Sequence, residues 1–281
     1  MENYNLIDGK EVSEHIKQQV KNEIEQNNLD VSLAVIVVGD NQASRVYVNN
    51  KKKACEYVGI RSVEYVLPED VTENELLGLI DELNNTSCIN GILCQLPLPN
   101  HIDESKVIER INHAKDVDGF SAINTGKLWL GKYDMAPCTA MGIIELLDYY
   151  NIDIEGKNCV IIGRSNIVGK PVAALLLERN ATVTICHSKT KNLSEITRNA
   201  DILIAAVGKT KFVTAYMVKD GAVVIDVGIN RDENGKLCGD VDFDIVRENA
   251  SYITPVPGGV GPMTVAVLMK NTLIAAKMQN E

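Results

Sequence analysis

Aromatic residues are scarce in this sequence and make up 5% of its 281 residues. A core with few rings must rest on Val, Ile, Leu and Ala, which favours a helix-covered parallel sheet over an aromatic-rich β-sandwich. Long apolar runs are missing as well, since the run over 34–38 is only about as long as a strand. The segment 1–10 has neither an apolar signal core nor the Arg-rich character of a transit peptide. We therefore expect a cytoplasmic protein that does not associate with membranes.

Basic clusters and paired cysteines are scarce too. The formal net charge is −10, and duplex nucleic acid or an anionic membrane would require clustered Lys and Arg. The seven cysteines are odd in number and include no C-x-x-C pair, which argues against a disulfide framework and a zinc site. We expect a protein of a reducing compartment, with no metal centre and no nucleic-acid partner.

The sequence does contain a regular alternation of strand-like and helix-like segments, which predicts an α/β fold with parallel strands. The first predicted strands are 33–38, 61–67 and 90–94, with helices over 43–58 and 74–83 between them. A second set of strands is predicted at 159–162, 182–186, 202–207 and 223–227. The stretch between these sets, 95–137, is predicted to form loops and one helix over 104–111.

The length suits one large domain or two domains of ordinary size. We predict an N-terminal βαβ catalytic domain over 1–140 and a C-terminal Rossmann-type dinucleotide-binding domain over 141–264, with a cleft between them. A closing helix over 265–281 is expected to return to the first domain. Ligands are expected where the strands end, as in other open α/β sheets.

A strand, a tight turn and a helix start follow one another at Cys159–Pro171. Gly163 would allow the turn and a close approach to phosphate, and Gly169 would allow tight packing of the helix. Ser165 stands where the strict G-x-G-x-x-G pattern has its second glycine, so this motif alone is weak evidence for a nucleotide.

The next strand strengthens the nucleotide interpretation. An NAD site usually has an acidic residue at the end of the second strand to hold the ribose, but 186–191 contains no acid. Ser188, the nearby cations and Arg164 in the first turn suit a 2′-phosphate, which favours NADP. Alternatively, Lys189 and Lys191 are merely solvated loop charges.

Lys51 interrupts the apolar face of the helix predicted over 43–58. Positions spaced three and four residues apart share this face with it, while Lys52 and Lys53 point elsewhere. Burial would favour the neutral amine and make Lys51 a base or proton donor. The alternative is that its ammonium reaches past the apolar face to the surface, and Tyr47, one turn earlier, could equally be a core residue.

Three further clusters lie in loops. Gln95 brings an amide to the end of the third strand. Asp116 and Asp118 flank a turn, where an Asx-turn is a simpler interpretation than a metal site because no third ligand is suitably spaced. The run Thr254–Thr264, with three prolines and three glycines, is typical of a loop that clamps a ligand or joins domains.

Together these segments resemble the methylenetetrahydrofolate dehydrogenase/cyclohydrolase family of bifunctional folate enzymes. The motifs run in the family's order over nearly the whole chain. They are Ser44-x-x-Tyr47-Val48-x-x-Lys51, Gln95-Leu-Pro-Leu-Pro99, Asp116-Val-Asp118-Gly119-Phe120, Pro137-Cys138-Thr139, Gly163-Arg164-Ser165-x-Ile167-Val168-Gly169-x-Pro171, Cys186-His187-Ser188-x-Thr190, Asp226-Val-Gly-Ile229-Asn230, Gly239-Asp-Val-Asp242 and Pro255-Val-Pro-Gly-Gly-Val-Gly-Pro-Met-Thr264. One departure is Ala140, where the family commonly has a proline that would pre-set the first helical turn.

The resemblance implies two reactions of one-carbon metabolism. Hydride passes from 5,10-methylenetetrahydrofolate to NADP, and water then opens the resulting methenyl ring to give 10-formyltetrahydrofolate. In this family the lysine matching Lys51 assists proton movement in the hydrolysis and is positioned or tuned by Gln95. Tyr47 would pack on the pterin, and Asp118 would bind its amine edge.

The resemblance also implies a cofactor site and a homodimer. Arg164 and Ser188 would hold the 2′-phosphate beside the turn that contains Gly163 and Ser165. The remaining implied site residues are Ile229 and Thr139 near the nicotinamide, and Pro257 and Gly258 on the folate side.

Two other functions are compatible with the same two-domain plan. A shikimate-dehydrogenase-like NADP oxidoreductase would not need Gln95 or the loop Thr254–Thr264. A non-enzymatic NADPH sensor could retain Gly163 and Ser188 but would have no use for Lys51.

Overall fold

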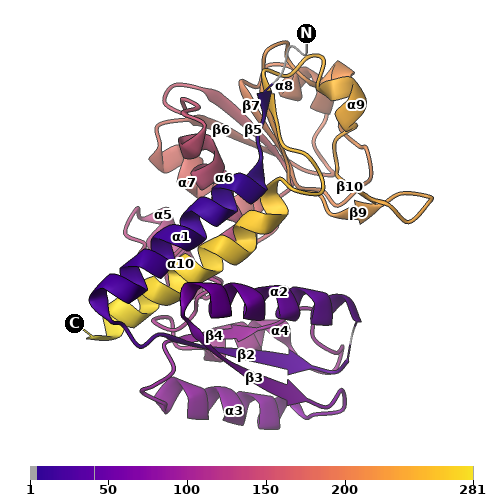
Figure 1. Cartoon of the computed structure of the whole chain (residues 1–281). Helices are drawn as coiled ribbons and strands as arrows, with labels where there is room; N and C mark the ends of the chain where they lie inside the picture. The colour runs from indigo at the N-terminus through magenta and orange to yellow at the C-terminus, as the bar shows by residue number, and fades with distance from the viewer. Residues whose placement is uncertain (1–4, 41, 281) are drawn as a thin grey trace. The chain divides into compact units, whose positions relative to one another are not determined.

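The computed structural model describes residues 5–40 and 42–280, without the side chains of residues 42–44, 46, 47 and 280. The chain forms two compact units (Figure 1). Unit 1 contains the described residues up to Ser13 together with Thr139–Thr264, and unit 2 contains Glu14–Cys138 and the residues from Val265 onward. The segment before Ser13, which was expected in the first domain, clusters with unit 1 because β1 pairs with β11.

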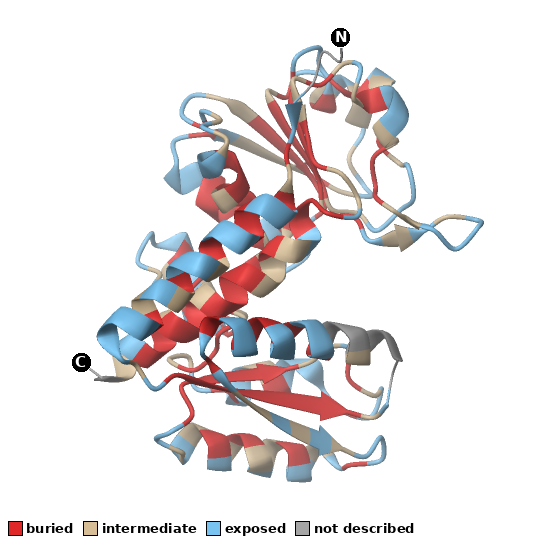
Figure 2. Cartoon of the chain, in the orientation of Figure 1, coloured by how far each residue is buried: buried red, intermediate tan, exposed pale blue. Residues whose placement is uncertain are grey.

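Unit 2 is built on a parallel three-stranded sheet of order β3-β2-β4. Its strands are β2 (Ser32–Val38), β3 (Arg61–Leu67) and β4 (Gly91–Cys94). Its helices are α2 (Gln42–Val58), α3 (Glu73–Asn85), α4 (Glu104–Arg110) and α5 (Ala122–Trp129). Every residue of β2 is buried, whereas the edge strand β3 is partly exposed (Figure 2), because β2 is covered on both faces.

The two faces of this sheet are covered by different helices. Figure 1 shows α2 along one face and α3 along the other. Side chains of β2, α3 and α4, including Ile36, Ile80 and Val107, form one apolar cluster. On the α2 side, Cys55 contacts Met269 of α10 at 3.6 Å between the sulfur atoms, so the last helix of the chain completes this core.

Unit 1 is built on a parallel sheet of order β1-β11-β8-β7-β5-β6. Its strands are β1 (Asn5–Leu6), β5 (Asn158–Ile162), β6 (Thr182–Cys186), β7 (Ile202–Ala205), β8 (Val223–Asp226) and β11 (Tyr252–Ile253). Helix α7 (Gly169–Glu178) packs on β5 and β6. Figure 1 shows α6 and α7 on one face of this sheet and α8 (Leu193–Thr197) and α9 (Phe243–Val246) on the other, with a 3₁₀ turn at Ala215–Met217.

Three helices contain a boundary between the units: α1 (Gly9–Asn27), α6 (Cys138–Tyr149) and α10 (Val260–Asn280). Helix α10 begins a few residues earlier than the closing helix that was predicted over 265–281. Among the described residues no helix is long and apolar enough to span a bilayer.

Some elements of the fold differ from the sequence prediction. Helix α5 lies in the stretch predicted to hold only one helix, and Ser121 caps it by accepting a hydrogen bond from the Asn124 N–H. The short strands β1 and β11 and the antiparallel pair of β9 (Asn230–Arg231) and β10 (Leu237–Cys238) were not predicted. Strands of two residues are too short to show a periodic pattern.

Candidate active site

Lys51 lies on the buried face of α2, as the spacing of the helix predicts. Its side chain is 8% exposed, beside Val48 and Cys55 on the same face, while Lys52 and Lys53 are exposed. The Lys51 Nζ donates to Gln95 Oε1 over 2.9 Å. The ammonium therefore does not reach past the apolar face to the solvent but meets an acceptor at the end of β4.

Gln95 is fixed at both ends of its side-chain amide. Its Nε2 donates to the Leu96 carbonyl over 2.7 Å, so the orientation that presents Oε1 to Lys51 is defined. Its backbone N–H donates to the Ile36 carbonyl over 2.9 Å and extends the pairing between β4 and β2. The strand end thus delivers the amide to α2, in agreement with the placement of ligands at strand ends.

Asp118 brings a carboxyl group to the same part of unit 2. Burial raises its pKa to about 6, the nearby Lys51 ammonium lowers it, and Asp116 raises it. A carboxyl with this pKa is ionised at neutral pH and takes up a proton in mildly acidic solution. Lys51, Gln95 and Asp118 therefore combine a cation, a fixed amide and a titratable acid, which is a set suited to moving protons.

The loop around Asp118 is held rigidly by its neighbour Asp116. The Asp116 carboxylate accepts from the N–H groups of Gly119 (3.0 Å) and Ser121 (2.8 Å) and from Asn124 Nδ2 (2.9 Å). Its role is structural, as the Asx-turn interpretation predicts. The preceding residues continue the sheet, because Ile92 N–H donates to the Lys115 carbonyl over 2.8 Å.

Asn271 of α10 also holds this loop and was not singled out from the sequence. Its buried Nδ2 donates to the carbonyl of Val117 (2.8 Å) and to that of Ala136 (3.0 Å). Because Val117 directly precedes Asp118, the final helix of the chain helps to set the position of the carboxyl group.

Neither cysteine next to this cluster can act as a thiolate. Burial raises the pKa of Cys55 and that of Cys94 to about 12, so both stay protonated at neutral pH. Burial raises the pKa of Cys138, which lies near Asp118 and Lys51, as well. Lys51 and Asp118 are therefore the ionisable side chains in this cluster that remain candidates for proton transfer. The side chain of Tyr47, predicted to pack on the pterin, lies outside the described residues.

The turn after β5 in unit 1 leaves no space for side chains. Gly163 has φ +131°, and a Cβ there would lie 2.2 Å from the Ala206 carbonyl oxygen. A Cβ on Gly169 would lie 2.3 Å from the Gly163 carbonyl oxygen. Both glycines are thus required by the close approach of backbone to backbone, as a tight turn between a strand and a helix demands.

Ser165 stabilises the turn before helix α7 with its side chain. Its Oγ accepts from the N–H groups of Val168 (3.2 Å) and Gly169 (3.3 Å). The hydroxyl therefore fixes the shape of the turn, and its proton remains available to an acceptor outside the helix.

Arg164 and Ser188 come from neighbouring strand ends. β5 and β6 pair in parallel up to Ile162 and Cys186, and the Gly163 N–H donates to the Cys186 carbonyl over 2.9 Å. Arg164 and Ser188 each lie two residues beyond that last pair, and both are exposed. One cation and one hydroxyl at adjacent strand ends are suited to a phosphate group.

The remaining predicted cofactor residues lie around the start of α10. Ile229 is 52% exposed, and its Cδ1 would be 3.9 Å from a Cβ on Gly261. Thr139 Oγ1 and Thr264 Oγ1 are 3.1 Å apart. The loop Thr254–Thr264 and these two residues therefore lie together in unit 1, where Pro257 is exposed and Gly258 is buried.

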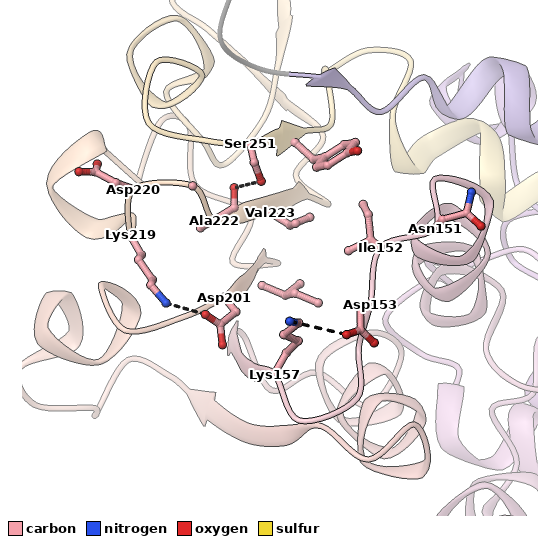
Figure 3. A pocket seen from close by; sticks show the side chains of 13 residues that line it. Asn151, Ile152, Asp153, Lys157, Asp201, Lys219, Asp220, Ala222, Val223 and Ser251 are labelled. Atoms are coloured by element: carbon pink, nitrogen blue, oxygen red, sulfur yellow. Dashed lines mark hydrogen bonds and ion pairs between the residues drawn. The ribbon is translucent and has the colours of Figure 1, made fainter.

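A separate hollow of about 350 Å³ lies at the opposite edge of this sheet (Figure 3). It is lined by residues that precede or begin β5, β7, β8 and β11. Its two lysines pair with acids of the same lining: Lys219 meets Asp201 at 2.6 Å and Lys157 meets Asp153 at 3.7 Å. Because ligands of open α/β sheets bind at the carboxyl ends of the strands, this hollow is not the cofactor site.

Family models match both parts of the chain. The model for the catalytic domain of tetrahydrofolate dehydrogenase/cyclohydrolase matches residues 7–118, and the model for its NAD(P)-binding domain matches residues 137–280. The chain belongs to the tetrahydrofolate dehydrogenase/cyclohydrolase family. This confirms the resemblance, the predicted fold class and the predicted pair of enzyme activities, with NADP as cofactor, and it does not favour either alternative function.

Individual relatives support this membership over the full length. A protein of Agathobacter rectalis named bifunctional protein FolD is 60% identical over 276 residues, covering 97% of this chain and 99% of its own. The bifunctional FolD crystal structure from Campylobacter jejuni has a TM-score of 0.95 at 52% identity, covering 98% and 99% of the two chains. The Trypanosoma brucei enzyme, described as complexed with NADP cofactor and inhibitor, has a TM-score of 0.94 at 38% identity over 99% of each chain.

Proposed function

We propose that this member of the family uses two separate sets of side chains, one in each unit, for its two reactions. The chain oxidises 5,10-methylenetetrahydrofolate to 5,10-methenyltetrahydrofolate with NADP and hydrolyses the product to 10-formyltetrahydrofolate. Folate chemistry is assigned to Lys51, Gln95 and Asp118 of unit 2, with Tyr47. NADP binding is assigned to the strand ends of unit 1.

The contact that carries the folate assignment is the 2.9 Å hydrogen bond from Lys51 Nζ to Gln95 Oε1. In the hydrolysis, water attacks the methenyl carbon, one C–N bond of the ring breaks, and the departing nitrogen takes up a proton. Lys51 moves a proton between the attacking water and that nitrogen. Gln95 holds the amine in place, and Asp118, ionised at neutral pH, stabilises its charged form and accepts from the amine edge of the pterin.

The strand ends of unit 1 fit NADP by their chemistry. NADP, when bound, supplies the hydride acceptor. Arg164 and Ser188 bind the 2′-phosphate, and the turn with Gly163 and Ser165 receives the diphosphate against the start of α7. The absence of an acid over 186–191 supports NADP over NAD.

The start of α10 is assigned to the reacting ends of the two ligands. We assign Ile229 and Thr139 to the nicotinamide, and Pro257 and Gly258 to the folate. Their support is the motif match and their proximity around the loop Thr254–Thr264 within unit 1. We further propose that the protein is a cytoplasmic homodimer, which follows the family resemblance and can be checked by light scattering.

The deciding experiment compares wild type, Lys51→Met and Lys52→Met in both reactions. We expect Lys51→Met to lose about 100-fold or more in cyclohydrolase rate, as is typical for removal of a proton-transfer group, while its NADPH affinity stays unchanged. Lys52 is exposed one residue away, so Lys52→Met should behave as wild type. Undiminished hydrolysis by Lys51→Met would exclude Lys51 from the mechanism.

A further inference from the structure

Asp240 carries a completely buried carboxylate at the carboxyl edge of the unit 1 sheet. Its Oδ2 accepts from the N–H groups of Val207 (2.6 Å) and Gly208 (3.0 Å), and its Oδ1 accepts from that of Lys209 (2.8 Å). Three successive amides thus converge on one side chain. Converging amides of this kind form an anion-binding concavity, and here the chain's own carboxylate fills it.

A second buried carboxylate, that of Asp226, holds Asp240 in place. Asp226 Oδ1 accepts from the Asp240 N–H over 2.9 Å, and its Oδ2 accepts from the Val241 N–H over 2.9 Å. This approach requires a glycine before Asp240, because a Cβ on Gly239 would lie 1.8 Å from Asp226 Oδ2. The motif Gly239-Asp-Val-Asp242 is therefore hydrogen-bonded to Asp226, the last residue of β8.

The amides gathered by Asp240 belong to the loops that border the proposed NADP site. Its Oδ1 also accepts from Asn230 Nδ2 over 2.8 Å, and Asn230 directly follows Ile229. Ala206 directly precedes the three residues whose N–H groups bond Asp240. Its carbonyl oxygen occupies the position where a Cβ on Gly163 would have to lie. The Asp240 carboxylate therefore connects the loop 206–209, which packs against Gly163, to Asn230, which follows Ile229.

We propose that Asp240 is a positioning residue for NADP, which fixes the loops 206–209 and 227–230 in the arrangement that the cofactor requires. This inference rests on the assignment of the strand ends of unit 1 to NADP. An asparagine at position 240 would keep the shape of the side chain but replace one acceptor oxygen by an NH₂ group. Turned either way, that NH₂ group would face at least one N–H donor, so at least one of these loops must move.

The test uses Asp240→Asn in three measurements: the KM for NADP, the Kd for NADPH, and hydrolysis of methenyltetrahydrofolate, which consumes no cofactor. We expect KM and Kd to rise by about tenfold or more, as loss of hydrogen bonds to a charged group implies. The kcat/KM for hydrolysis should stay within about twofold of wild type, because Lys51, Gln95 and Asp118 lie in the other unit. Wild-type NADPH affinity in this variant would overturn the proposal.

Two further variants separate positioning from a general loss of stability. Asp242→Asn removes an acid of the same motif that pairs at 3.1 Å with Lys211, and it should leave NADPH affinity unchanged. Asn230→Ala deletes one donor to Asp240 and should raise the Kd for NADPH about threefold without changing hydrolysis. If Asp240→Asn fails to fold, unchanged affinity in Asn230→Ala overturns the proposal instead.

Arg164→Ala distinguishes failure of this inference from failure of the NADP assignment. If Arg164→Ala weakens NADPH binding and Asp240→Asn does not, only the positioning role is wrong. If neither variant changes the affinity, the assignment of this edge to NADP is wrong as well. Weaker binding in both supports both.

Discussion

Lys51 on helix α2 and Gln95 at the end of strand β4 meet through a hydrogen bond of 2.9 Å, although 44 residues separate them in the chain. The same glutamine amide donates to the Leu96 carbonyl over 2.7 Å, so its two ends have different partners. A side chain that is fixed in this way can hold the lysine amine at one point. This relationship makes the contribution of Gln95 separable from that of Lys51.

Replacing Gln95 by leucine should impair hydrolysis more than oxidation. The variant removes the acceptor of the Lys51 Nζ and leaves the amine free to adopt other rotamers, so we expect cyclohydrolase kcat to fall about tenfold or more. NADPH affinity should not change. Gln95→Glu keeps an acceptor at this position and should retain more of the hydrolytic rate than Gln95→Leu; the reverse order would contradict a positioning role.

The pKa of Asp118, raised to about 6 by burial, predicts a pH dependence of folate affinity. Below about pH 6 the carboxylate takes up a proton. If it accepts hydrogen bonds from the pterin as proposed, it then loses part of that capacity, and KM for methenyltetrahydrofolate should rise. Asp118→Asn should have a higher KM at neutral pH and no such rise between about pH 7 and 5. Steady-state hydrolysis across this range measures both, and a parallel rise in the variant would assign the titration to another group.

The same carboxyl predicts the sign of a stability effect. Because its folded-state pKa lies above the ordinary aspartate value of 3.8, the folded protein binds this proton more tightly than the unfolded chain does. The free energy of unfolding should therefore fall in wild type, relative to Asp118→Asn, as the pH rises from about 4 to about 6. Urea unfolding at several pH values measures the difference, and an opposite slope would contradict the raised pKa.

Arg164 should determine the preference for NADP over NAD. In the proposed cofactor site this cation pairs with the 2′-phosphate, which NAD lacks, so Arg164→Ala should raise KM for NADP about tenfold or more. KM for NAD should change by less than about twofold. Lys236→Ala removes an exposed cation elsewhere in unit 1 and should change neither. An equal rise in KM for NADP and for NAD in Arg164→Ala would show that Arg164 does not distinguish the cofactors by the 2′-phosphate.

Asn271→Ala should lower both stability and hydrolysis. The variant leaves the carbonyls of Val117 and Ala136 buried without the Asn271 donor, which costs roughly 2–4 kcal/mol of unfolding free energy. Thr272→Val is a matched control, because the buried Thr272 hydroxyl donates to the Leu268 carbonyl of its own helix over 2.7 Å, and the loss of this bond should cost less than about 1 kcal/mol. Similar losses in the two variants would argue against a special role for Asn271.

Much of the site could be predicted from local patterns. The spacing on α2 identified Lys51 as a buried lysine, and the strand-end rule identified Gln95, Arg164 and Ser188. In each case the signal is either a periodicity or a position relative to one secondary-structure element. Both kinds of signal can be recognised from the local sequence alone. The family match then supplied the chemistry that the pattern could not.

Asn271 and Asp240 could not be found in this way. Each is a single polar residue whose partners lie far away in the chain: Asn271 bonds a carbonyl 154 residues distant, and Asp240 gathers amides more than 30 residues before it. Nothing in the local spacing says which backbone groups a buried side chain will meet. Helix α5 is an intermediate case, because its cap at Ser121 is a readable signal, whereas Gly126 and Asn124 lower its helix propensity.

The passage of the chain back and forth between the two units bears on how the protein is made. β1 cannot pair until β11 has been synthesised, since Asn5 N–H bonds the Ser251 carbonyl, and Asn271 is added later still. A ribosome that stops before residue 265 therefore releases a product that lacks most of α10, including Asn271, which bonds the Val117 carbonyl beside Asp118. Prematurely terminated chains should thus be poor hydrolases even with Lys51 and Gln95 intact, so a cell gains full folate chemistry only from finished polypeptides.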